Sequence, residues 1–279
     1  MPDEIIITEK ISGAESTGEK NVIAGRIPVG KKFLTSYGYC ICRPSPLVVV
    51  APHAAGDDWH SGRLARRLAK KMGASLVVNL NYIKPDNPRA KLHPELVEDF
   101  NQLRWSHIHH KYLWRSKNHA MREFYRNIRT LTRRGRKLAT DKKAVVVYIH
   151  GMRNNNYGLD LGVGLKFSPT RKTRLIHSAQ DDLSQCSGLI TMKIGQLKRL
   201  YRLLSAEVLS RFHLGVSIGR QHIGWSKKSA NQYHKHEKRH DYAIQLEVSR
   251  RLRQRRRMRD LIPILSDILL AVFNHSTPC

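Results

Sequence analysis

The sequence is poor in acidic residues. Its 279 residues include 50 Lys and Arg against 22 Asp and Glu, which gives a formal net charge of +28. A charge of this size favours anionic surroundings such as nucleic acid, an anionic lipid surface or an acidic polymer, without choosing among them. A merely soluble basic surface is the simpler alternative. Hydrophobic residues make up 41% of the chain, which is long enough to bury a full core.

Cysteine is also scarce, and no apolar run is long. The four cysteines, at positions 40, 42, 186 and 279, form no CxxC pair or disulfide framework, so we expect free thiols and a cytoplasmic location. The longest apolar run, residues 261–273, is interrupted by Pro263 and Asp267 and falls short of the ~20 residues of a membrane span. We therefore expect no membrane span, and the acidic N-terminus argues against a signal peptide.

Apolar periodicity predicts alternating strands and helices from residue 47 onward. Residues 47–51 and 76–80 are continuous buried strands, and residues 61–72 between them have helical periodicity. This strand–helix–strand unit predicts an α/β fold with a parallel or mixed sheet covered on both faces. We expect a lead-in of strands and turns over residues 1–45 and a single domain over 46–279. Further strands are expected at 144–149, 214–218 and 242–248, helices at 95–138 (in part), 194–211 and 261–273, and irregular structure at 151–190.

Two of the buried strands deliver a histidine at the carboxyl end. His53 follows residues 47–51 and is followed by Asp57 and Asp58, and His150 follows residues 144–149. Imidazole and carboxylate ligands suit a catalytic Zn²⁺, which takes three protein ligands and keeps one position for water. Neighbouring strand ends at the carboxyl edge of an open sheet are where such sites lie. The alternative is that both histidines merely cap strands, and either aspartate can serve as the third ligand.

Two further residues fit the chemistry of such a site. Alternation along residues 244–248 puts Gln245 and Glu247 on the same face, where Glu247 can accept a proton from water and pass it to a leaving nitrogen. Arg89 lies in a Pro-containing loop and can hold a substrate carboxylate in a bidentate fork. A solvent-facing glutamate and a solvated arginine are the alternatives.

The remaining histidines and the arginine run favour a surface role. The histidines at 107, 109, 110, 234, 236 and 240 lack metal-ligand spacing and are expected on the surface. Seven of the ten residues over 250–259 are arginine. This run, with Trp105, Trp114 and Tyr125 on basic helices, supports a different hypothesis, a nucleic-acid-binding protein on an inactive hydrolase scaffold.

Taken in order, several of these stretches resemble the N-formylglutamate amidohydrolase family, which is related in fold to zinc carboxypeptidases. The stretches are residues 50–56, Asp58 with residues 61–69, residues 73–79, residues 86–89, His150-Gly151 and residues 243–247. They cover about residues 46–253. His150 stands before Gly151 rather than in the family's Asp-x-His-Ser-like context, and Pro88 separates Asn87 from Arg89.

The resemblance implies a three-layer, phosphorylase/hydrolase-like (zinc exopeptidase-like) α/β fold with a central mixed sheet. It also implies a zinc site with His53, Asp58 and His150 as ligands, Glu247 as general base and Arg89 as the residue that binds a carboxylate. The expected function is a zinc-dependent amidohydrolase acting on a small anionic amide. A larger γ-glutamyl or peptidoglycan-derived peptide is a further option.

Overall fold

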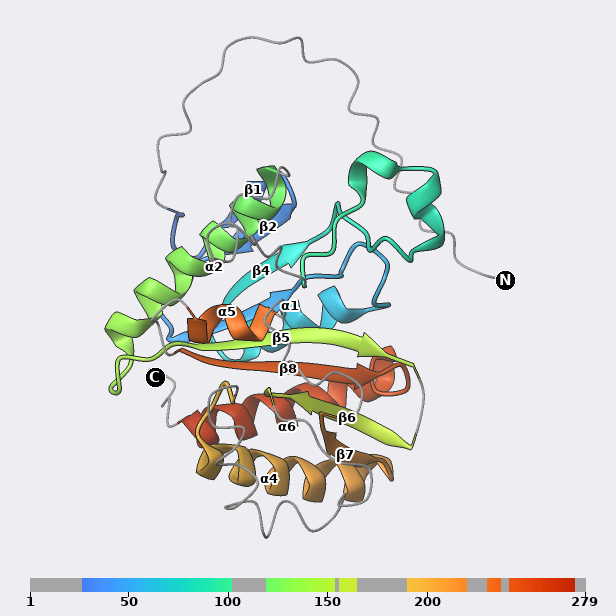
Figure 1. Ribbon diagram of the computed structural model, residues 1–279. Helices are drawn as coiled ribbons and strands as arrows, with labels where there is room; N and C mark the ends of the chain where they lie inside the picture. The colour runs from blue at the N-terminus through green and yellow to red at the C-terminus, as the bar shows by residue number, and fades with distance from the viewer. Residues whose placement is uncertain are drawn as a thin grey trace.

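The computed structural model describes residues 27–101, 119–153, 156–164, 190–219, 230–236 and 241–273. An eight-stranded mixed sheet runs through the molecule in the order β1-β2-β4-β3-β5-β8-β6-β7 (Figure 1). The central strands β4, β3, β5 and β8 are parallel, whereas β1 with β2, β2 with β4, and β6 with β8 are antiparallel. The strands are β1 Lys32–Thr35, β2 Gly38–Ile41, β3 Leu47–Ala51, β4 Ser75–Asn79, β5 Val145–Met152, β6 Tyr157–Gly162, β7 Gly215–Ile218 and β8 Tyr242–Ser249.

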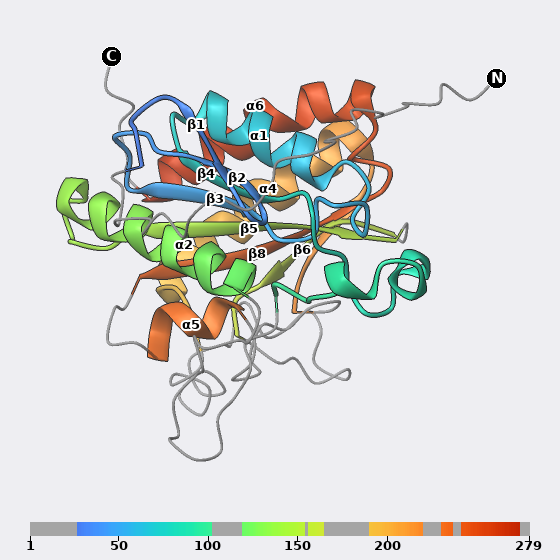
Figure 2. The same ribbon diagram turned by 90° about the horizontal axis from the view of Figure 1, so that it is seen from above.

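Helices cover both faces of the sheet, so the fold has three layers. The helices α1 (Ser61–Lys71), α4 (Ile194–Phe212) and α6 (Arg255–Phe273) pack on one face, and α2 (His119–Leu138) and α5 (Ala230–His236) pack on the other (Figure 2). Two short 3₁₀ helices, η1 (Pro88–Lys91) and η2 (Pro94–Leu96), lie in the connection that follows β4. The α/β class with a mixed central sheet agrees with the sequence expectation.

Alternation along the strands divides the core into two halves. In β3, Leu47 and Val49 pack with α1, α4 and α6, whereas Val48 and Val50 pack with α2. Both faces of the central strands are therefore buried, which explains their continuous apolar runs. The same alternation places His150 of β5 and Glu247 of β8 on the side of α2 and α5.

Most predicted elements are found within a few residues of their expected bounds, with three corrections. Residues 157–162, expected to be irregular, form β6, and the two glycines of its sequence YGLDLG hide the strand pattern. Residues 95–101, expected in a mostly helical segment, contain only the end of η2 at Leu96, and residues 97–101 are not helical. The last helix begins at Arg255 rather than 261, so part of the arginine run is helical.

The N-terminal hairpin of β1 and β2 forms one edge of the same sheet through the pairing of β2 with β4. Cys40 and Cys42 lie here as buried free thiols, as expected from their spacing. Within the described residues, none of the helices combines the length and the apolar character needed to cross a bilayer.

Candidate metal centre

A tight turn brings Asp58 back onto His53. His53 follows β3 by two residues, and the amide of Asp58 donates to the carbonyl of His53 at 3.2 Å. The turn itself is held from β4, because the side chain of Asn79 donates to the carbonyl of Pro52 at 2.6 Å. The carbonyl of Asp58 then accepts from the amide of Ser61, the first residue of α1. The sequence Pro-His-x₄-Asp thus forms one rigid corner at the carboxyl end of β3.

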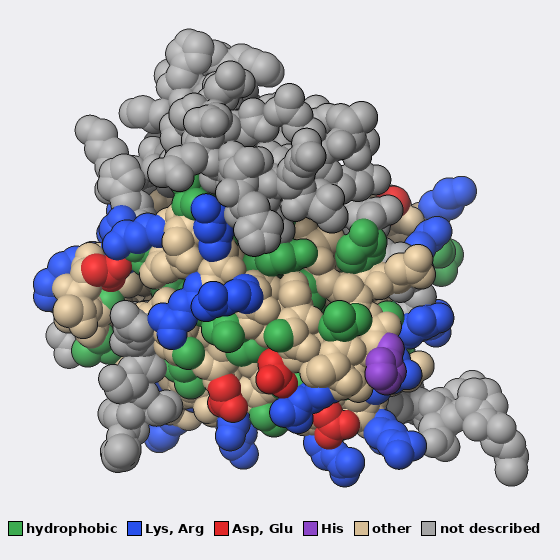
Figure 3. Space-filling view, turned by 90° about the horizontal axis from the view of Figure 1, so that it is seen from below, with side chains coloured by type: hydrophobic (Ala, Val, Ile, Leu, Met, Phe, Trp, Pro, Cys, Tyr) green, Lys and Arg blue, Asp and Glu red, His purple; other side chains and the backbone are tan. Residues whose placement is uncertain are grey.

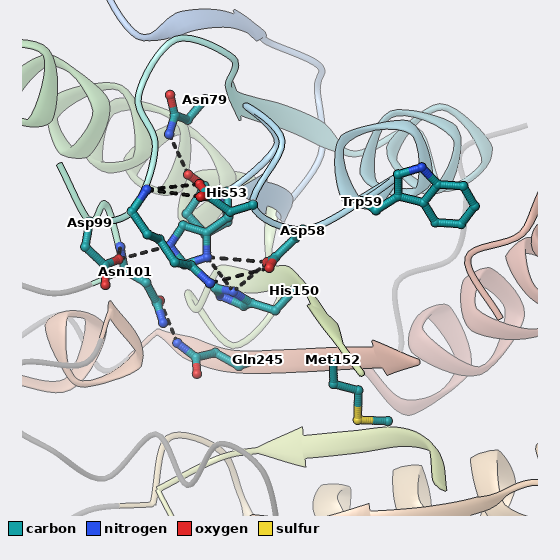
Figure 4. A network of polar contacts seen from close by, with 12 residues as sticks. His53, Asp58, Trp59, Asn79, Asp99, Asn101, His150, Met152 and Gln245 are labelled. Carbon is teal, nitrogen blue, oxygen red and sulfur yellow. Dashed lines mark hydrogen bonds and ion pairs between the residues drawn. The ribbon is translucent and has the colours of Figure 1, made fainter. Parts of the chain in front are cut away.

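Three potential ligand atoms converge at this corner (Figure 4). The Nδ1 atoms of His53 and His150 lie 3.2 Å apart, and Oδ2 of Asp58 lies 3.4 Å from the first and 3.5 Å from the second. All three residues are buried. Two imidazole nitrogens and one carboxylate oxygen therefore form a nearly equilateral triangle at the carboxyl edge of the sheet.

The triangle fits a divalent metal. Tetrahedral Zn²⁺ with bonds of about 2.0–2.1 Å holds its ligand atoms roughly 3.3 Å apart, close to the three observed separations. Two histidines and one carboxylate are also a donor set that zinc uses at catalytic sites, with a fourth position left for water. Among the described residues, His53, Asp58 and His150 form a group whose potential ligand atoms all lie within 4.8 Å of one another.

Asp99 completes the surroundings of His53. Its Oδ1 lies 2.9 Å from Nε2 of His53 and also accepts from the amide of Asn101 at 2.9 Å. A carboxylate at Nε2 fixes the orientation of the ring and leaves the lone pair of Nδ1 for a metal. Carboxylates that hydrogen-bond to metal-binding histidines commonly have this effect. Gln245 of β8 holds this segment by donating to the side chain of Asn101 at 2.8 Å.

The titration behaviour of the cluster follows from these contacts. Burial alone raises the pKa of Asp58, but hydrogen bonds to His150 and His53 hold it well below its ordinary value. Burial lowers the pKa of His53, and the two carboxylates of Asp58 and Asp99 more than offset this, so the pKa is raised. The carboxylate of Asp58 is thus ionised at neutral pH, as a metal ligand must be.

Glu247 lies beside the metal ligands. It is the register partner of His150 across the parallel pair of β5 and β8, and the two side chains share one face of the sheet. Burial, and then the negative charge of Asp58, raise the pKa of Glu247 to about 8. Gln245 and Glu247 share this face, as the alternation predicted. A carboxyl group with a perturbed pKa beside a candidate metal site is suited to proton transfer.

The connection after β4 supplies a cation to the site. Nζ of Lys84 lies 3.4 Å from Oδ1 of Asp58, and the charges of Asp58, Asp99, Asp57 and Glu247 outweigh burial and raise the pKa of Lys84. Asp57 does not face the histidines. Its carboxylate accepts from the amide of Lys84 and from Asn87 at 2.6 Å, so it anchors the loop instead.

Arg89 lies over the corner rather than among the ligands. Its Nη2 donates to the carbonyl of Ala55 at 3.1 Å, and its side chain is exposed. Pro88 begins the short helix η1, and Asn87 caps this helix through the amide of Arg89. A role for Arg89 in carboxylate binding stays a prediction.

A buried arginine from the basic run braces the site. Arg253 donates from Nε to the carbonyl of Val248 at 3.0 Å, from Nη2 to that of Met152 at 3.2 Å, and from Nη1 to that of Trp59. One guanidinium therefore ties together the strand of Glu247, the strand of His150 and the corner of Asp58. A Cβ at Gly151 would lie 2.5 Å from its guanidinium carbon, so glycine leaves the room it needs.

Asp99, Lys84 and Arg253 carried no signal in the sequence. Asp99 and Lys84 lie in the connection after β4, and Arg253 resembled the other arginines of its run. His234 was expected on the surface, but it is buried and its Nε2 lies 2.8 Å from the hydroxyl of Tyr148. The side chains of the other five histidines in that expectation lie outside the described residues, as do Trp105 and Trp114.

Comparisons with known proteins found structural similarity at low sequence identity. No family model and no curated protein matches the chain. An N-formylglutamate amidohydrolase from Ralstonia eutropha is similar with a TM-score of 0.45 and 15% identity, over 84% of this chain and 94% of that one. A bacteriophage poly-gamma-glutamate hydrolase is similar with a TM-score of 0.44 and 12% identity, over 85% and 90%.

A gene product from Agrobacterium tumefaciens, Atu2144, is similar at the same level, with a TM-score of 0.45, 14% identity and coverage of 83% and 92%. Likeness of this degree does not transfer an activity to the present chain. The function must therefore be argued from the geometry of the site.

Asp99 is expected to strengthen metal binding. An Asp99→Asn variant removes the carboxylate from His53, and we expect Zn²⁺ affinity to fall by about 10–100-fold. Competition with a chromophoric chelator measures this change. The exposed Asp86 lies in the same connection and provides an Asp86→Asn control, which should keep wild-type affinity. Equal affinity in both variants would show that His53 is oriented without Asp99.

Glu247 is expected to make the stability of the metal-free protein depend on pH. Its carboxyl has an ordinary pKa of 4.5 and a folded-state pKa of about 8, so the folded chain binds the proton more tightly between these values. The free energy of unfolding therefore falls as pH rises through this range. A Glu247→Gln variant lacks this loss. In EDTA, the melting temperature of the variant minus that of wild type should be larger at about pH 8 than at about pH 5. A difference that does not change with pH would contradict the raised pKa of Glu247.

Gly151 is expected to be required for the position of Arg253. A Gly151→Ala variant forces the guanidinium to shift, and we expect a loss of about 1–3 kcal/mol in the free energy of unfolding. Urea denaturation measures it. Gly195 of α4 has open space around its Cβ position, so Gly195→Ala should leave stability unchanged or slightly raised. A Gly151→Ala protein as stable as this control would mean that the brace is dispensable.

Proposed function

We propose that this chain is a metal-dependent hydrolase that cleaves an amide bond in a carboxylate-bearing substrate, with Zn²⁺ as the metal. The observation that carries the proposal is the buried triangle of Nδ1 of His53, Nδ1 of His150 and Oδ2 of Asp58, with edges of 3.2–3.5 Å. The raised pKa of Glu247 in the next strand and the carboxylate of Asp99 on His53 support a catalytic rather than a purely structural site.

Each residue has a distinct role in this proposal. His53, Asp58 and His150 hold the metal, which when bound polarises the substrate carbonyl and lowers the pKa of water. Glu247 accepts the proton of the attacking water and returns it to the nitrogen of the departing amine. Asp99 keeps the ring of His53 oriented, and Arg253 keeps the three supporting segments in register.

An exposed arginine at the rim of the site favours an anionic substrate. The carboxyl groups around Lys84 already balance its charge, but Arg89 is exposed on the turn between His53 and Asp58 and has its guanidinium available to an anion. We assign Arg89 to a substrate carboxylate, because a guanidinium can bind it through two parallel hydrogen bonds. N-acylglutamates and γ-glutamyl amides are therefore the first substrates to test.

Metal content and activity test the proposal together. The chain, stripped with a chelator and dialysed against Zn²⁺, is expected to bind about one ion, measured by mass spectrometry of the metal, and to release amine from one of these amides. We expect His150→Ala to lose both properties. Glu247→Gln should retain the ion but lose about 100-fold or more in kcat.

A His213→Asn variant is the control. His213 is exposed at the end of α4 with a φ of 54°, which Asn tolerates, so both metal and activity should remain. The proposal is wrong if the wild-type chain binds no stoichiometric metal. It is also wrong if His53→Ala leaves the amidase activity unchanged.

A further inference from the structure

A cluster of arginines forms where the first turns of α1 and α6 meet. Arg63 lies in the first turn of α1 and Arg255 begins α6, and these two helices lie side by side (Figure 2). The fold thus joins residues that are 192 positions apart in sequence. Burial, and then the charges of Arg255, Arg67 and Arg66, lower the pKa of Arg63. We call Trp59, Arg63, Arg67, Arg250 and Arg255 the basic face.

The basic face is unfavourable for folding by itself. The first turns of α1 and α6 contain no acidic residue, although the helix dipole favours anions there and disfavours cations by about 0.3–1 kcal/mol each. Among the residues that the structure describes, no carboxylate forms an ion pair with Arg63, Arg67 or Arg255. An external anion would remove this repulsion.

Other basic surfaces of the molecule are arranged differently. On α4, Arg211 pairs with Glu207 at 2.9 Å, four residues earlier. Figure 3, which looks at the molecule from the side of α4, shows acidic side chains among the basic ones. On α2, Arg126, Arg129 and Arg133 are exposed along a single helix. At the basic face a guanidinium, that of Arg250, lies over the exposed ring of Trp59, whereas Lys32 and Lys143 lie over the buried rings of Tyr39 and Tyr242.

That ring belongs to Trp59, which is 43% exposed next to the metal-ligand candidate Asp58. The guanidinium of Arg250 lies 5.3 Å from its centroid, and the ring of His60 lies 3.7 Å away. An exposed aromatic ring flanked by guanidinium groups is the arrangement on which unpaired bases stack while the cations neutralise phosphates. A carboxylate polymer would use the cations but would gain nothing from the ring.

We propose that the basic face binds single-stranded nucleic acid, with Trp59 stacking on a base and Arg63, Arg67 and Arg255 neutralising the phosphate backbone. The site contains none of the metal ligands, although Trp59 adjoins Asp58, and the proposal does not depend on the proposed hydrolase activity. Tyr125, which the sequence suggested as a stacking residue, is buried and donates to the carbonyl of Phe100, so it cannot take this role.

The test compares two variants of equal charge. The full chain, stripped of metal, is titrated into a fluorescein-labelled 20-nucleotide oligo(dT), and anisotropy is followed at several salt concentrations. In the first variant, Arg63, Arg67 and Arg255 are all replaced by Gln. In the control, Arg126, Arg129 and Arg133 of α2 are replaced by Gln, which removes the same charge from the other face of the sheet.

We expect the first variant to bind at least 10-fold more weakly at 0.1 M salt. The magnitude of the slope of log K against log salt should fall by about 2, because each of the three lost phosphate contacts contributes ~0.7. The α2 control should change affinity by less than about threefold. A Trp59→Leu variant should lose at least about fivefold. Melting temperatures of the first variant should equal or exceed that of wild type, because the cations oppose the helix dipoles.

Three results would overturn the proposal. Equal losses in the two triple variants would mean that net charge alone attracts the oligonucleotide. Binding of poly-L-glutamate as tight as that of oligo(dT), with no effect of Trp59→Leu, would assign the face to acidic polymers. Absence of binding at 0.05 M salt would mean that the face is only a solvated surface. None of these results bears on the metal content or amidase activity.

Discussion

The parallel pairing of β3, β5 and β8 is the constraint on which the candidate metal centre depends. Val50 of β3 pairs with Tyr148 of β5, and His150 pairs with Glu247 of β8, so the polar residues emerge just where the apolar runs end. Burying two imidazoles and several carboxylates is costly unless they satisfy one another. The shared register places His150 beside Glu247, and the corner after β3 brings Asp58 to within 3.4 and 3.5 Å of the two histidines.

Register alone does not hold the corner that carries Asp58, since this residue lies beyond the end of β3. Two braces act from outside the strand: the side chain of Asn79 on the carbonyl of Pro52, and the guanidinium of Arg253 on the carbonyl of Trp59. Arg253 also reaches the carbonyls at the ends of β5 and β8. Arginine is suited to this task because its planar guanidinium carries five donors. Lysine, with its single ammonium, cannot replace it.

Local sequence patterns predicted the fold class and most elements, because apolar periodicity is a local property and the central strands are buried on both faces. His53, Asp58 and His150 were predictable for the same reason, as they stand at or near strand ends. Asp99 and Lys84 were not, because they reach the site through the irregular connection after β4, whose path no periodicity determines. Arg253 lies in a run whose composition indicates solvent, and only the space above Gly151 and three convergent carbonyls explain its burial.

The cations discussed above fall into two groups that differ in their surroundings. Lys84 and Arg253 both lie near the carboxyl groups of Asp58 and Glu247. At Lys84 these and two further carboxylates outweigh burial and raise the pKa, whereas at Arg253 burial outweighs them and the pKa is lowered. These two cations therefore help to balance the carboxylates of Asp58 and Glu247, while the guanidinium of Arg253 also donates to three backbone carbonyls. Arg63 has only cations as charged neighbours that shift its pKa. Balance within the site does not account for that arginine or for Arg255, and no carboxylate of the described residues pairs with either, which is the setting in which we propose an external anion.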